Sequence, residues 1–517
     1  MRVVEATSKA PALEATVRGG VGALGGIPPP SLLRPENPFQ EDSGAVDPPG
    51  LGEVLVVSGK GRERGSLRHP SGKRADHHLV RTSPTRYDGT LRLLRHGRAL
   101  IPGASSALPR VTGFDPAAPA FVRGRGPCVW DEDGNKFVDL NLGYGSLIHG
   151  HSPPEIVAAL RSQLRKGLHF ASPQRIEAEV AELLLDLVPT ADRVVFCTTG
   201  TEATFNAVRL ARHATHRRGV LVFEGHYHMN DAAATSPPVS GRGRRRDPSV
   251  GEVTPIPDSW GDVYVAEYNS VSSVERIQAR AGTSIGTVIL EPIMCNAGVI
   301  PPTGAFLREL RRMTEARGQV LVFDEVFTGF RVAPGGAQEM YGIRPDLSCF
   351  SKALGGGMPI AALAGRRELM DRLGSPGLPY GSTYAGHTLA LAGTRASLEG
   401  IRREGRRFRD RLQGLTERAC RGLEEVGRKA GLRVLAQQVP GAFQFYFTGR
   451  SALHNFREAL EVDREMYRRA QSHLMDRGFF FHPDNFESLV LSTSHGPRDI
   501  DRFVTAAGET FAELSAS

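Results

Sequence analysis

Hydrophobic positions divide the chain into an aperiodic start and a periodic remainder. From about residue 88 onward, apolar residues recur at helical spacing over Pro154–Lys166 and Gln174–Leu187. Short runs of β-branched residues come next, and each leads through a loop into a helical pattern. These runs are Arg193–Cys197, Gly219–Phe223, Gly286–Leu290, Gln319–Phe323 and Leu347–Phe350. Apolar strands that alternate with helices predict an α/β fold with a mostly parallel sheet covered on both faces.

A different pattern begins near Asp371 and predicts a smaller α+β unit. Long helical patterns are interleaved there with short strands, and Pro497–Asp499 opens a last helix. The expected helices and strands are Arg406–Ala430, Asp463–Arg477, Ala442–Phe447, Gly478–Phe481 and Ser488–Ser492.

The first 85 residues have the composition of a disordered extension. They contain 10 Pro and 12 Gly, and Phe39 is their only aromatic residue, so they cannot bury enough apolar surface to offset the entropy of ordering. Basic residues between Lys60 and Arg81 could contact nucleic acid or an acidic partner, but no aromatic residues are interleaved for base stacking. A solvated tail is the better interpretation. A second basic run, Arg242–Arg246, lies in the Gly-, Pro- and Ser-rich stretch Ser236–Pro257, which we expect to be a mobile surface loop.

Composition excludes several classes of protein. The net charge is +8, but the first 85 residues hold 11 Lys and Arg against 9 Asp and Glu, so the excess is not concentrated in the tail. This distribution argues against a nucleic-acid partner. No window approaches 18 uninterrupted apolar residues, which argues against a membrane helix. Five scattered cysteines without a CxxC pair predict neither a disulfide framework nor a zinc site, and they favour a cytoplasmic protein without a metal.

Loops at the carboxyl ends of the predicted strands carry the candidate chemistry, because ligands bind at these ends in open α/β sheets. In Thr198–Ala203, small residues and free amides at a helix N-terminus suit a phosphate. In Glu224–His228, Tyr227 could stack on an aromatic ligand and a neighbouring histidine could hydrogen-bond. Two histidines spaced i, i+2 could also suggest a metal, but no third ligand lies nearby.

Two further loops place charge at buried strand ends. Asp324 follows four apolar residues, so its carboxylate needs a cationic partner, and a salt bridge to Arg331 is the structural alternative to a functional role. Lys352 ends an apolar strand and precedes three glycines that leave room for a bulky ligand. An isolated lysine at a strand end is usually a surface residue, but a buried one has a lowered pKa and can form Schiff bases.

Together, the four loops supply what a binding site for pyridoxal 5'-phosphate requires. They offer a phosphate cradle, a stacking ring, a carboxylate and a lysine that can form a Schiff base. The phosphate lies on a helix N-terminus, the ring is stacked, the pyridinium nitrogen faces an acid and the aldehyde joins the lysine. Purely structural explanations would have to hold at four loops at once. The sequence therefore predicts an enzyme that uses pyridoxal 5'-phosphate.

Several motifs resemble those of class III pyridoxal-phosphate-dependent aminotransferases. Glu291-Pro292, Leu321–Arg331 and Ser351–Pro359 look like the family signature, and the likeness is strongest to the glutamate-1-semialdehyde 2,1-aminomutase subgroup. Supporting stretches are Trp130–Asn135, Ile148–His151, Gly200–Arg212 and Val299–Pro302. The resemblance implies the fold-type I architecture, with a large cofactor domain, a small α+β domain built from both chain ends, and a homodimer with shared active sites. The expected divisions are an extension over 1–88, the first part of the small domain and the entry to the large domain over 89–170, the large domain over 171–370 and the C-terminal small domain over 371–517.

The resemblance also implies roles for individual residues. Lys352 would form the Schiff base and shuttle the proton, and Asp324 would keep the pyridine nitrogen protonated. The phosphate would be held at Thr199, Gly200 and Thr201, and by Thr383 of the other subunit. Tyr227 would stack on the ring, and Asn296 would lie near its phenolic oxygen. Arg110 would meet a substrate carboxylate, and Glu487 matches a substrate-side acid of the aminomutases.

The sequence departs from the aminomutase pattern where the substrate is handled. The substrate-side serine is Ala107, the loop after Thr383 reads Ala385–Thr388, and Phe481–Asn485 is bulkier and more polar than the aminomutase segment. The gating loop that retains the diamine is replaced by the unrelated Ala232–Pro257. We therefore expect amino-group transfer on a different small amino acid or on an amino-aldehyde or keto substrate. Glutamate-1-semialdehyde 2,1-aminomutase is the alternative, and a non-enzymatic amine sensor is a remote one because Lys352 and Asp324 are both present.

Overall fold

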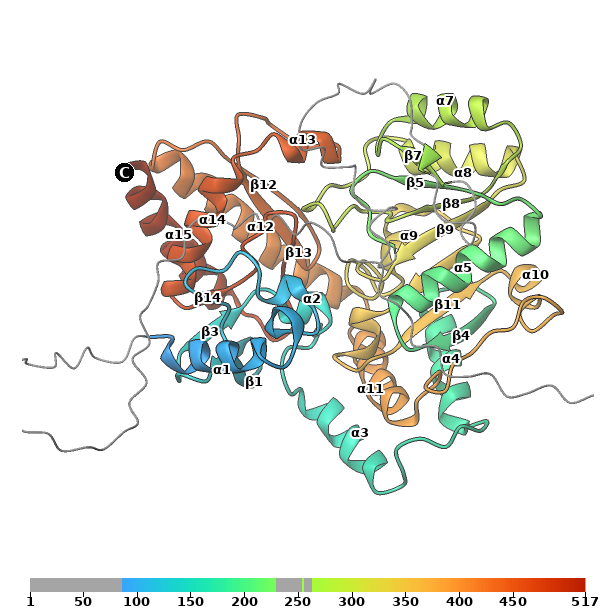
Figure 1. The fold of residues 1–517 in the computed structure, drawn as a ribbon, viewed down its shortest axis with the longest axis horizontal. Coiled ribbons are helices and arrows are strands. Elements are labelled where there is room, and N and C mark those ends of the chain that lie inside the picture. The colour runs from blue at the N-terminus through green and yellow to red at the C-terminus, as the bar shows by residue number, and fades with distance from the viewer. Residues whose placement is uncertain (1–85, 229–252, 255–262, 517) are drawn as a thin grey trace, which may run out of the picture. The chain divides into compact units, whose positions relative to one another are not determined.

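An eight-stranded sheet forms the centre of the structure, a computed structural model that describes residues 86–228, 253–254 and 263–516 (Figure 1). Its strand order is β4-β11-β10-β9-β8-β5-β7-β6. The bounds are β4 Arg193–Cys197, β5 Gly219–Phe223, β6 Val253–Thr254, β7 Val263–Ala266, β8 Ile285–Leu290, β9 Val320–Glu325, β10 Leu347–Phe350 and β11 Ala361–Gly365. The run from β10 to β7 is parallel, and only β11 and β6 pair antiparallel with their neighbours. The prediction of a mostly parallel sheet is confirmed.

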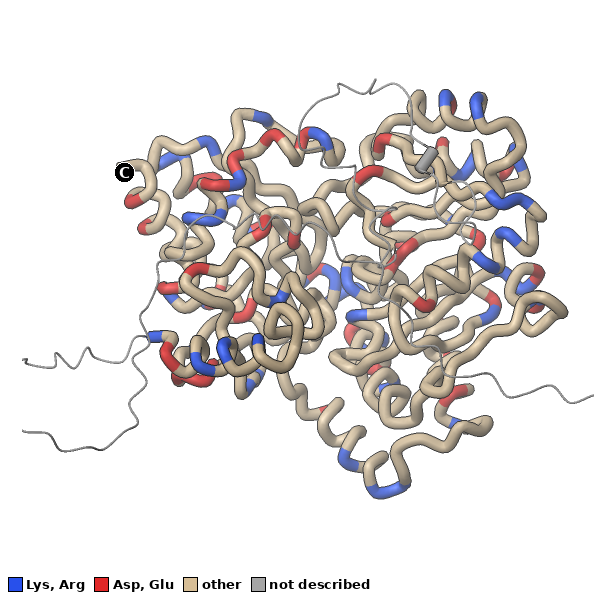
Figure 2. Tube along the Cα trace, viewed as in Figure 1, with Lys and Arg blue, Asp and Glu red and all other residues tan. Residues whose placement is uncertain are grey.

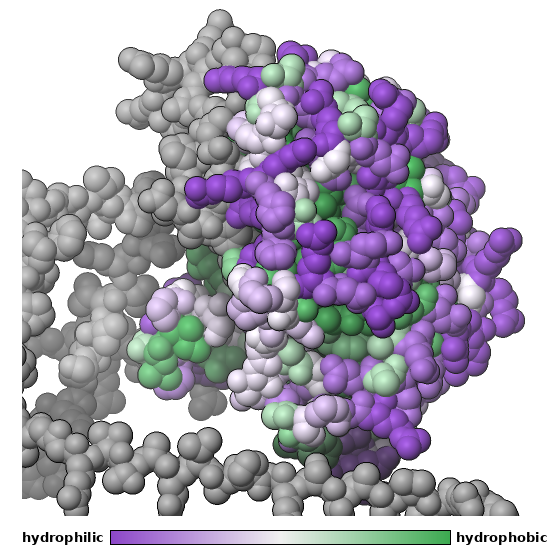
Figure 3. Space-filling view, turned by 90° about the vertical axis from the view of Figure 1, so that its right-hand side faces the viewer, coloured by the Kyte–Doolittle hydropathy of each residue, from purple (hydrophilic) through white to green (hydrophobic). Residues whose placement is uncertain are grey.

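Helices cover both faces of this sheet, as the alternation of strand residues requires. Leu221 and Phe323 pack in one cluster with α7 (Val271–Ala281) and α8 (Phe306–Ala316). The neighbouring Val222 and Val322 pack in another cluster with α5 (Gly200–Thr215). Figure 3 shows the face that lies on the right of Figure 1, where mostly hydrophilic side chains surround smaller hydrophobic areas.

Two smaller sheets lie outside the central one. One sheet has the order β1-β2-β3-β14, in which β3 pairs with β14, a strand from the last tenth of the chain. The second small sheet has the order β12-β13-β15. The bounds are β1 Phe121–Arg125, β2 Cys128–Asp131, β3 Lys136–Asp139, β12 Val434–Val439, β13 Ala442–Phe447, β14 Phe479–Phe480 and β15 Leu489–Val490. Chain segments more than 300 residues apart therefore share one sheet.

The remaining helices connect and cover these sheets. Near the start they are α1 Asp88–Arg98, η1 Pro102–Ala104, η2 Leu108–Arg110, α2 Leu142–Gly145, α3 Pro154–Leu164 and α4 Arg175–Leu187. In the middle they are α9 Gly336–Tyr341, η3 Lys352–Gly355, α10 Arg367–Met370 and α11 Thr388–Glu404. Toward the end they are α12 Arg406–Lys429, α13 Phe456–Leu460, α14 Arg464–Asp476 and α15 Pro497–Ala516.

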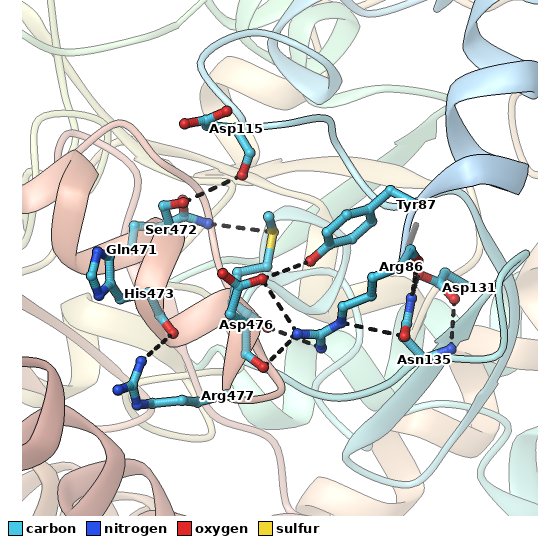
Figure 4. A network of polar contacts seen from close by, with 11 residues as sticks. Arg86, Tyr87, Asp115, Asp131, Asn135, Gln471, Ser472, His473, Asp476 and Arg477 are labelled. Atoms are coloured by element: carbon cyan, nitrogen blue, oxygen red, sulfur yellow. Dashed lines mark hydrogen bonds and ion pairs between the residues drawn. The ribbon is translucent and has the colours of Figure 1, made fainter. Parts of the chain in front are cut away.

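The first described residues attach to α14 through a polar network (Figure 4). Tyr87 Oη and Arg86 Nη1 each lie 3.3 Å from Asp476 Oδ1. Arg86 also contacts Asn135 Oδ1 at 3.3 Å, which links the network to the turn before β3. Further along, Ser472 Oγ donates to the carbonyl of Asp115 at 3.4 Å. Both ends of the stretch between residues 87 and 115 are thus anchored to the C-terminal part of the chain.

Several sequence expectations lie outside the described residues. They are the disordered extension before residue 86 and the basic loop with Arg242–Arg246. In the described part, Lys and Arg alternate with Asp and Glu along the trace (Figure 2). No described helix combines the length and the apolar character that a membrane span needs.

Candidate active site

The predicted loops meet at one edge of the central sheet. Strands β5, β8, β9 and β10 are parallel, so their carboxyl ends lie at the same edge. Strand β4 runs in the same direction because β11, between β4 and β10, is antiparallel to both. The contacts of Gly200 confirm the convergence, since a Cβ there would lie 2.9 Å from Val326 and 3.6 Å from Ser351. Three candidate loops therefore pack directly around this glycine.

The N-terminus of α5 offers amide donors toward this edge. Thr199 is the N-cap, and its Oγ1 accepts from the Glu202 amide at 3.1 Å. The Glu202 carboxylate in turn accepts from the Thr198 amide at 2.8 Å. Among the described residues, no hydrogen bond is formed by the amides of Gly200 and Thr201. This is the arrangement that binds an anion at a helix N-terminus.

Asp324, near the end of β9, is a buried carboxylate with defined partners. Its Oδ2 lies 2.8 Å from His228 Nδ1, and its Oδ1 accepts from the Val326 amide at 3.0 Å. Both side chains are almost fully buried, at 3% and 0% exposure. The suggested salt bridge to Arg331 is wrong, because His228 comes from the loop after β5, 96 positions away, and supplies the partner instead.

Arg331 is fully buried and bonded only to backbone carbonyls among the described residues. Its guanidinium donates to Phe327 O at 3.3 Å, to Leu491 O at 3.4 Å and to Gly145 O. Burial lowers its pKa to about 10. The turn after β9 points this side chain away from Asp324, so adjacency in sequence was a misleading guide to the ion pair.

Glu291, directly after β8, joins three parts of the site. Its Oε1 accepts from the Tyr227 amide at 2.8 Å and from Asn296 Nδ2 at 2.9 Å. Its Oε2 accepts from the Cys295 amide at 2.8 Å. Burial raises the pKa of this carboxyl, while His228 and the backbone amides of Cys295 and Tyr227 oppose the shift. One side chain therefore fixes the backbone of Tyr227 and the amide of Asn296.

Lys352 follows β10 in a strained backbone conformation. Its φ is 44°, in the left-handed region that few residues other than glycine adopt. Its Nζ lies 4.9 Å from the centre of the Phe327 ring. Burial lowers the pKa of Lys352; Glu487, Glu291 and Asp324 oppose this shift, and Arg331 adds to it. Lys352 therefore lies within electrostatic range of Asp324 and Glu487, the two acids that the sequence analysis assigned to the site.

A second acid, Glu487, lies within electrostatic range of Lys352 and of two tyrosines. Burial raises the pKa of Glu487, and the neighbouring His482 and Lys352 oppose the shift. Burial raises the pKa of Tyr144 to about 12, with a further increase from Glu487 and a decrease from Arg110. Burial and Glu487 also raise the pKa of Tyr227. Glu487 and Arg110 therefore lie within electrostatic range of the same tyrosine.

Thr383 is placed apart from these residues. It lies in the loop before α11 and is exposed, and the described residues form no hydrogen bond with it. The family resemblance assigns it to the phosphate site of another subunit.

Three contributors were not assigned from the sequence: His228 as the partner of Asp324, Glu291 as a connecting side chain, and Tyr144. The sequence offered two signals, the histidines on either side of Tyr227 and the Glu291-Pro292 motif, but neither identified the partner. Both histidines are buried whereas Tyr227 is 44% exposed. No group of His, Cys, Asp or Glu in the described ranges could hold a metal ion, and the two histidines instead contact Glu291 and Asp324.

Comparison with known proteins shows the family to which the chain is similar. The family model described as "Aminotransferase class-III" matches residues 113–444. A glutamate-1-semialdehyde 2,1-aminomutase from Neisseria meningitidis serogroup C is 37% identical over 426 residues, which cover 82% of this chain and 99% of that protein. A protein of the same name from Chloroflexus aggregans is 36% identical and covers 81% of this chain and 96% of its own length.

Solved structures share the fold. An omega-transaminase from Sphaerobacter thermophilus is 30% identical with a TM-score of 0.75, covering 83% of this chain and 98% of its own. A β-phenylalanine aminotransferase from Variovorax paradoxus is 27% identical with a TM-score of 0.73, covering 83% of this chain and 96% of its own. A glutamate-1-semialdehyde aminomutase from Pseudomonas aeruginosa, in complex with PMP, is 22% identical with a TM-score of 0.71 and the same coverage, and it supports the fold alone.

Proposed function

Because the chain belongs to the class III aminotransferase family, we propose that it transfers amino groups with pyridoxal 5'-phosphate held in this site and with Lys352 as the catalytic amine. The family makes it a transaminase or an aminomutase. When bound, the cofactor supplies an aldehyde and an electron-withdrawing ring. The observation that carries the proposal is the placement of Lys352, Asp324 and the α5 N-terminus around one edge of the sheet.

The residues present fit this cofactor. The free amides of Gly200 and Thr201 suit its phosphate, and the cap on Thr199 holds their turn in place. Asp324, fixed by His228, suits a protonated ring nitrogen because an ionised acid favours a nearby cation. Tyr227 and Asn296, both held by Glu291, suit the ring face and its phenolic oxygen.

The surroundings of Lys352 also suit a group that accepts a proton and gives it back. Burial favours its neutral amine, which can accept a proton from a substrate carbon. Glu487, Glu291 and Asp324 stabilise the protonated form, so that the charge is tolerated once it has formed. Because burial and the three acids act in opposite directions, the amine of Lys352 can both accept and release a proton.

We propose a small amino acid, amino aldehyde or keto compound as the substrate, with Arg110 and Glu487 facing it. The departures at Ala107, Phe481–Asn485 and Ala232–Pro257 favour transfer between two molecules, because an aminomutase must retain its diamine until the second half-reaction. The alternative, glutamate-1-semialdehyde 2,1-aminomutase, is favoured by relatives of that name at 36–37% identity.

A spectral experiment tests the proposal and separates the alternatives. The protein is purified with pyridoxal 5'-phosphate, and its visible spectrum is followed with amino donors and, separately, with glutamate-1-semialdehyde alone. We expect a donor to convert the cofactor to its amine form without isomerisation. Formation of 5-aminolevulinate without a donor would instead establish the aminomutase. If neither substrate changes the spectrum, amino-group transfer is wrong.

We also propose a homodimer in which Thr383 reaches the partner's phosphate site. Exposed apolar side chains lie at the end of α3 and on the two loops near the start of α11, namely Leu164, Leu168, Phe170, Tyr380 and Tyr384. Such a group of exposed apolar residues is typical of an interface. Light scattering should give twice the chain mass of 55.9 kDa. A particle of single-chain mass that is fully active would contradict the shared site.

A further inference from the structure

Within the described residues, one hydrogen bond joins the segment that carries Arg110 to a distant part of the chain. Residues 99–114 form hydrogen bonds only among themselves and with the end of α1, apart from one bond within the described chain. In that bond, His482 Nε2 lies 2.9 Å from the carbonyl oxygen of Pro109, the residue before Arg110. The Arg110 side chain is exposed, and no described residue fixes it by a hydrogen bond or an ion pair.

The local contacts of His482 set the direction of this bond. The Asp484 amide donates to His482 Nδ1 at 3.1 Å, so Nδ1 must carry a lone pair. The ring proton of a neutral histidine is then on Nε2, which donates to Pro109. Packing contacts join the same two segments. The Phe114 ring meets the His482 ring edge-on at 5.6 Å between ring centres, and Gly113 packs against Pro483.

The loop that carries His482 is itself firmly held. Tyr467 Oη donates to the His482 carbonyl at 3.3 Å. Gln444 Nε2 donates to the carbonyls of Asn485 at 3.0 Å and Glu487 at 2.7 Å. Because His482 and Glu487 share this loop, the bond to Pro109 sets the position of Arg110 relative to the substrate-side acid.

The bond lies beside the candidate active site. The rings of His482 and Tyr144 are 6.0 Å apart, and both Arg110 and Glu487 act on Tyr144 electrostatically. Two of the departures from the aminomutase pattern lie in the segments joined here, Ala107 in one and Phe481–Asn485 in the other. These two departures therefore lie close together in the structure.

We propose that His482 is a positioning residue that holds Arg110 at the mouth of the site, and that it thereby sets the preference for substrates with a carboxylate. An arginine binds a carboxylate well only if its backbone is fixed, because ordering a loose segment on binding costs affinity. The inference rests on the proposed function in that the ligand is a substrate of the same site.

Binding of simple probes to the holoenzyme tests this role without turnover. Butanoate carries a carboxylate, and butanamide is its neutral counterpart. The dissociation constant of each is measured by calorimetry for the wild type, His482→Leu and His482→Gln. We expect His482→Leu to raise the dissociation constant of butanoate about tenfold, which is the scale of one hydrogen bond. The dissociation constant of butanamide should stay unchanged. The glutamine variant, which keeps a donor, should restore most of the affinity.

A double-mutant cycle shows whether the effect acts through Arg110. In an Arg110→Ala background, which itself should lose butanoate affinity, His482→Leu should add nothing further. The proposal would be overturned if His482→Leu weakened the binding of butanoate and butanamide equally, or if it left the affinity for butanoate unchanged. It would also be overturned if His482→Leu weakened butanoate binding as much in the Arg110→Ala background as in the wild type. If His482→Leu does not fold, His482→Asn gives the same expectation because its amide is too short to reach Pro109.

The spectral response to amino donors is recorded in parallel for every variant. If the wild type binds butanoate through Arg110 but no donor changes its spectrum, the proposed function fails while the role of His482 stands. If donors react and the probes do not distinguish the variants, the role of His482 fails alone.

Discussion

Replacing Lys352 with alanine is expected to lower turnover by at least about 10⁴-fold, the scale seen when a covalent catalytic group is removed. The physical reason is that no other described lysine can substitute for it. Lys136, Lys166 and Lys429 are exposed, whereas Lys352 stands at the end of β10 among buried residues. Activity assays and the visible spectrum check the result, with Lys136→Ala as a matched control that should behave as wild type. Turnover that survives in Lys352→Ala would contradict the assignment.

The same variant should change how the stability of the cofactor-free protein depends on pH. Burial lowers the folded-state pKa of Lys352 from 10.5, so the unfolded chain binds more protons between that lowered pKa and 10.5. Stability contributed by this group therefore increases as pH rises through that window. In thermal melts at rising alkaline pH, Lys352→Ala should lose stability relative to wild type. A difference that stays constant with pH would show that the lysine is not held in a neutralising environment.

Replacing Asp324 with asparagine is expected to lower turnover by about 10²–10³-fold, as when a preorganised electrostatic group is lost, while the fold is kept. The amide can still occupy the space beside His228 and accept from the Val326 amide, but it carries no charge to hold a proton on a ring nitrogen. The rate of amino transfer and the cofactor spectrum are both measured.

Glu325 supplies the matched control for this variant. It is the next residue in β9 and is equally buried, but it accepts from Thr328 Oγ1 at 2.7 Å and from the amide of Ala337 at 2.7 Å. Glu325→Gln should therefore affect stability near α9 and leave the cofactor spectrum unchanged. A near-normal rate for Asp324→Asn, or an equal loss in both variants, would remove the assigned role of Asp324.

Local patterns predicted most of the central sheet because its strands are continuous apolar runs. Strands β4, β5 and β10 have the bounds that the sequence predicted. Strand β11 was not predicted, since its residues Ala361–Gly365 are alanines and a glycine around a single leucine and include no β-branched residue. Their place in the sheet comes from pairing with β4 and β10, which no local pattern contains.

The sequence predicted those site residues that directly follow an apolar strand. Lys352 and Asp324 could be identified because a charge after an apolar run requires an explanation. The partners of these groups could not, because they come from distant segments. His228 reaches Asp324 across 96 positions, and His482 reaches Pro109 across 373. The alternative of an ion pair between Asp324 and Arg331 is wrong for the same reason, since it assumed that a near neighbour in sequence would be the partner.

The attachment point of the cofactor tests the central claim most directly. The protein purified with pyridoxal 5'-phosphate is reduced with borohydride, digested and analysed by mass spectrometry. The account predicts one pyridoxyl group per chain, on the peptide that contains Lys352. A label on any other lysine, or no label on a protein that nevertheless transfers amino groups, would contradict it.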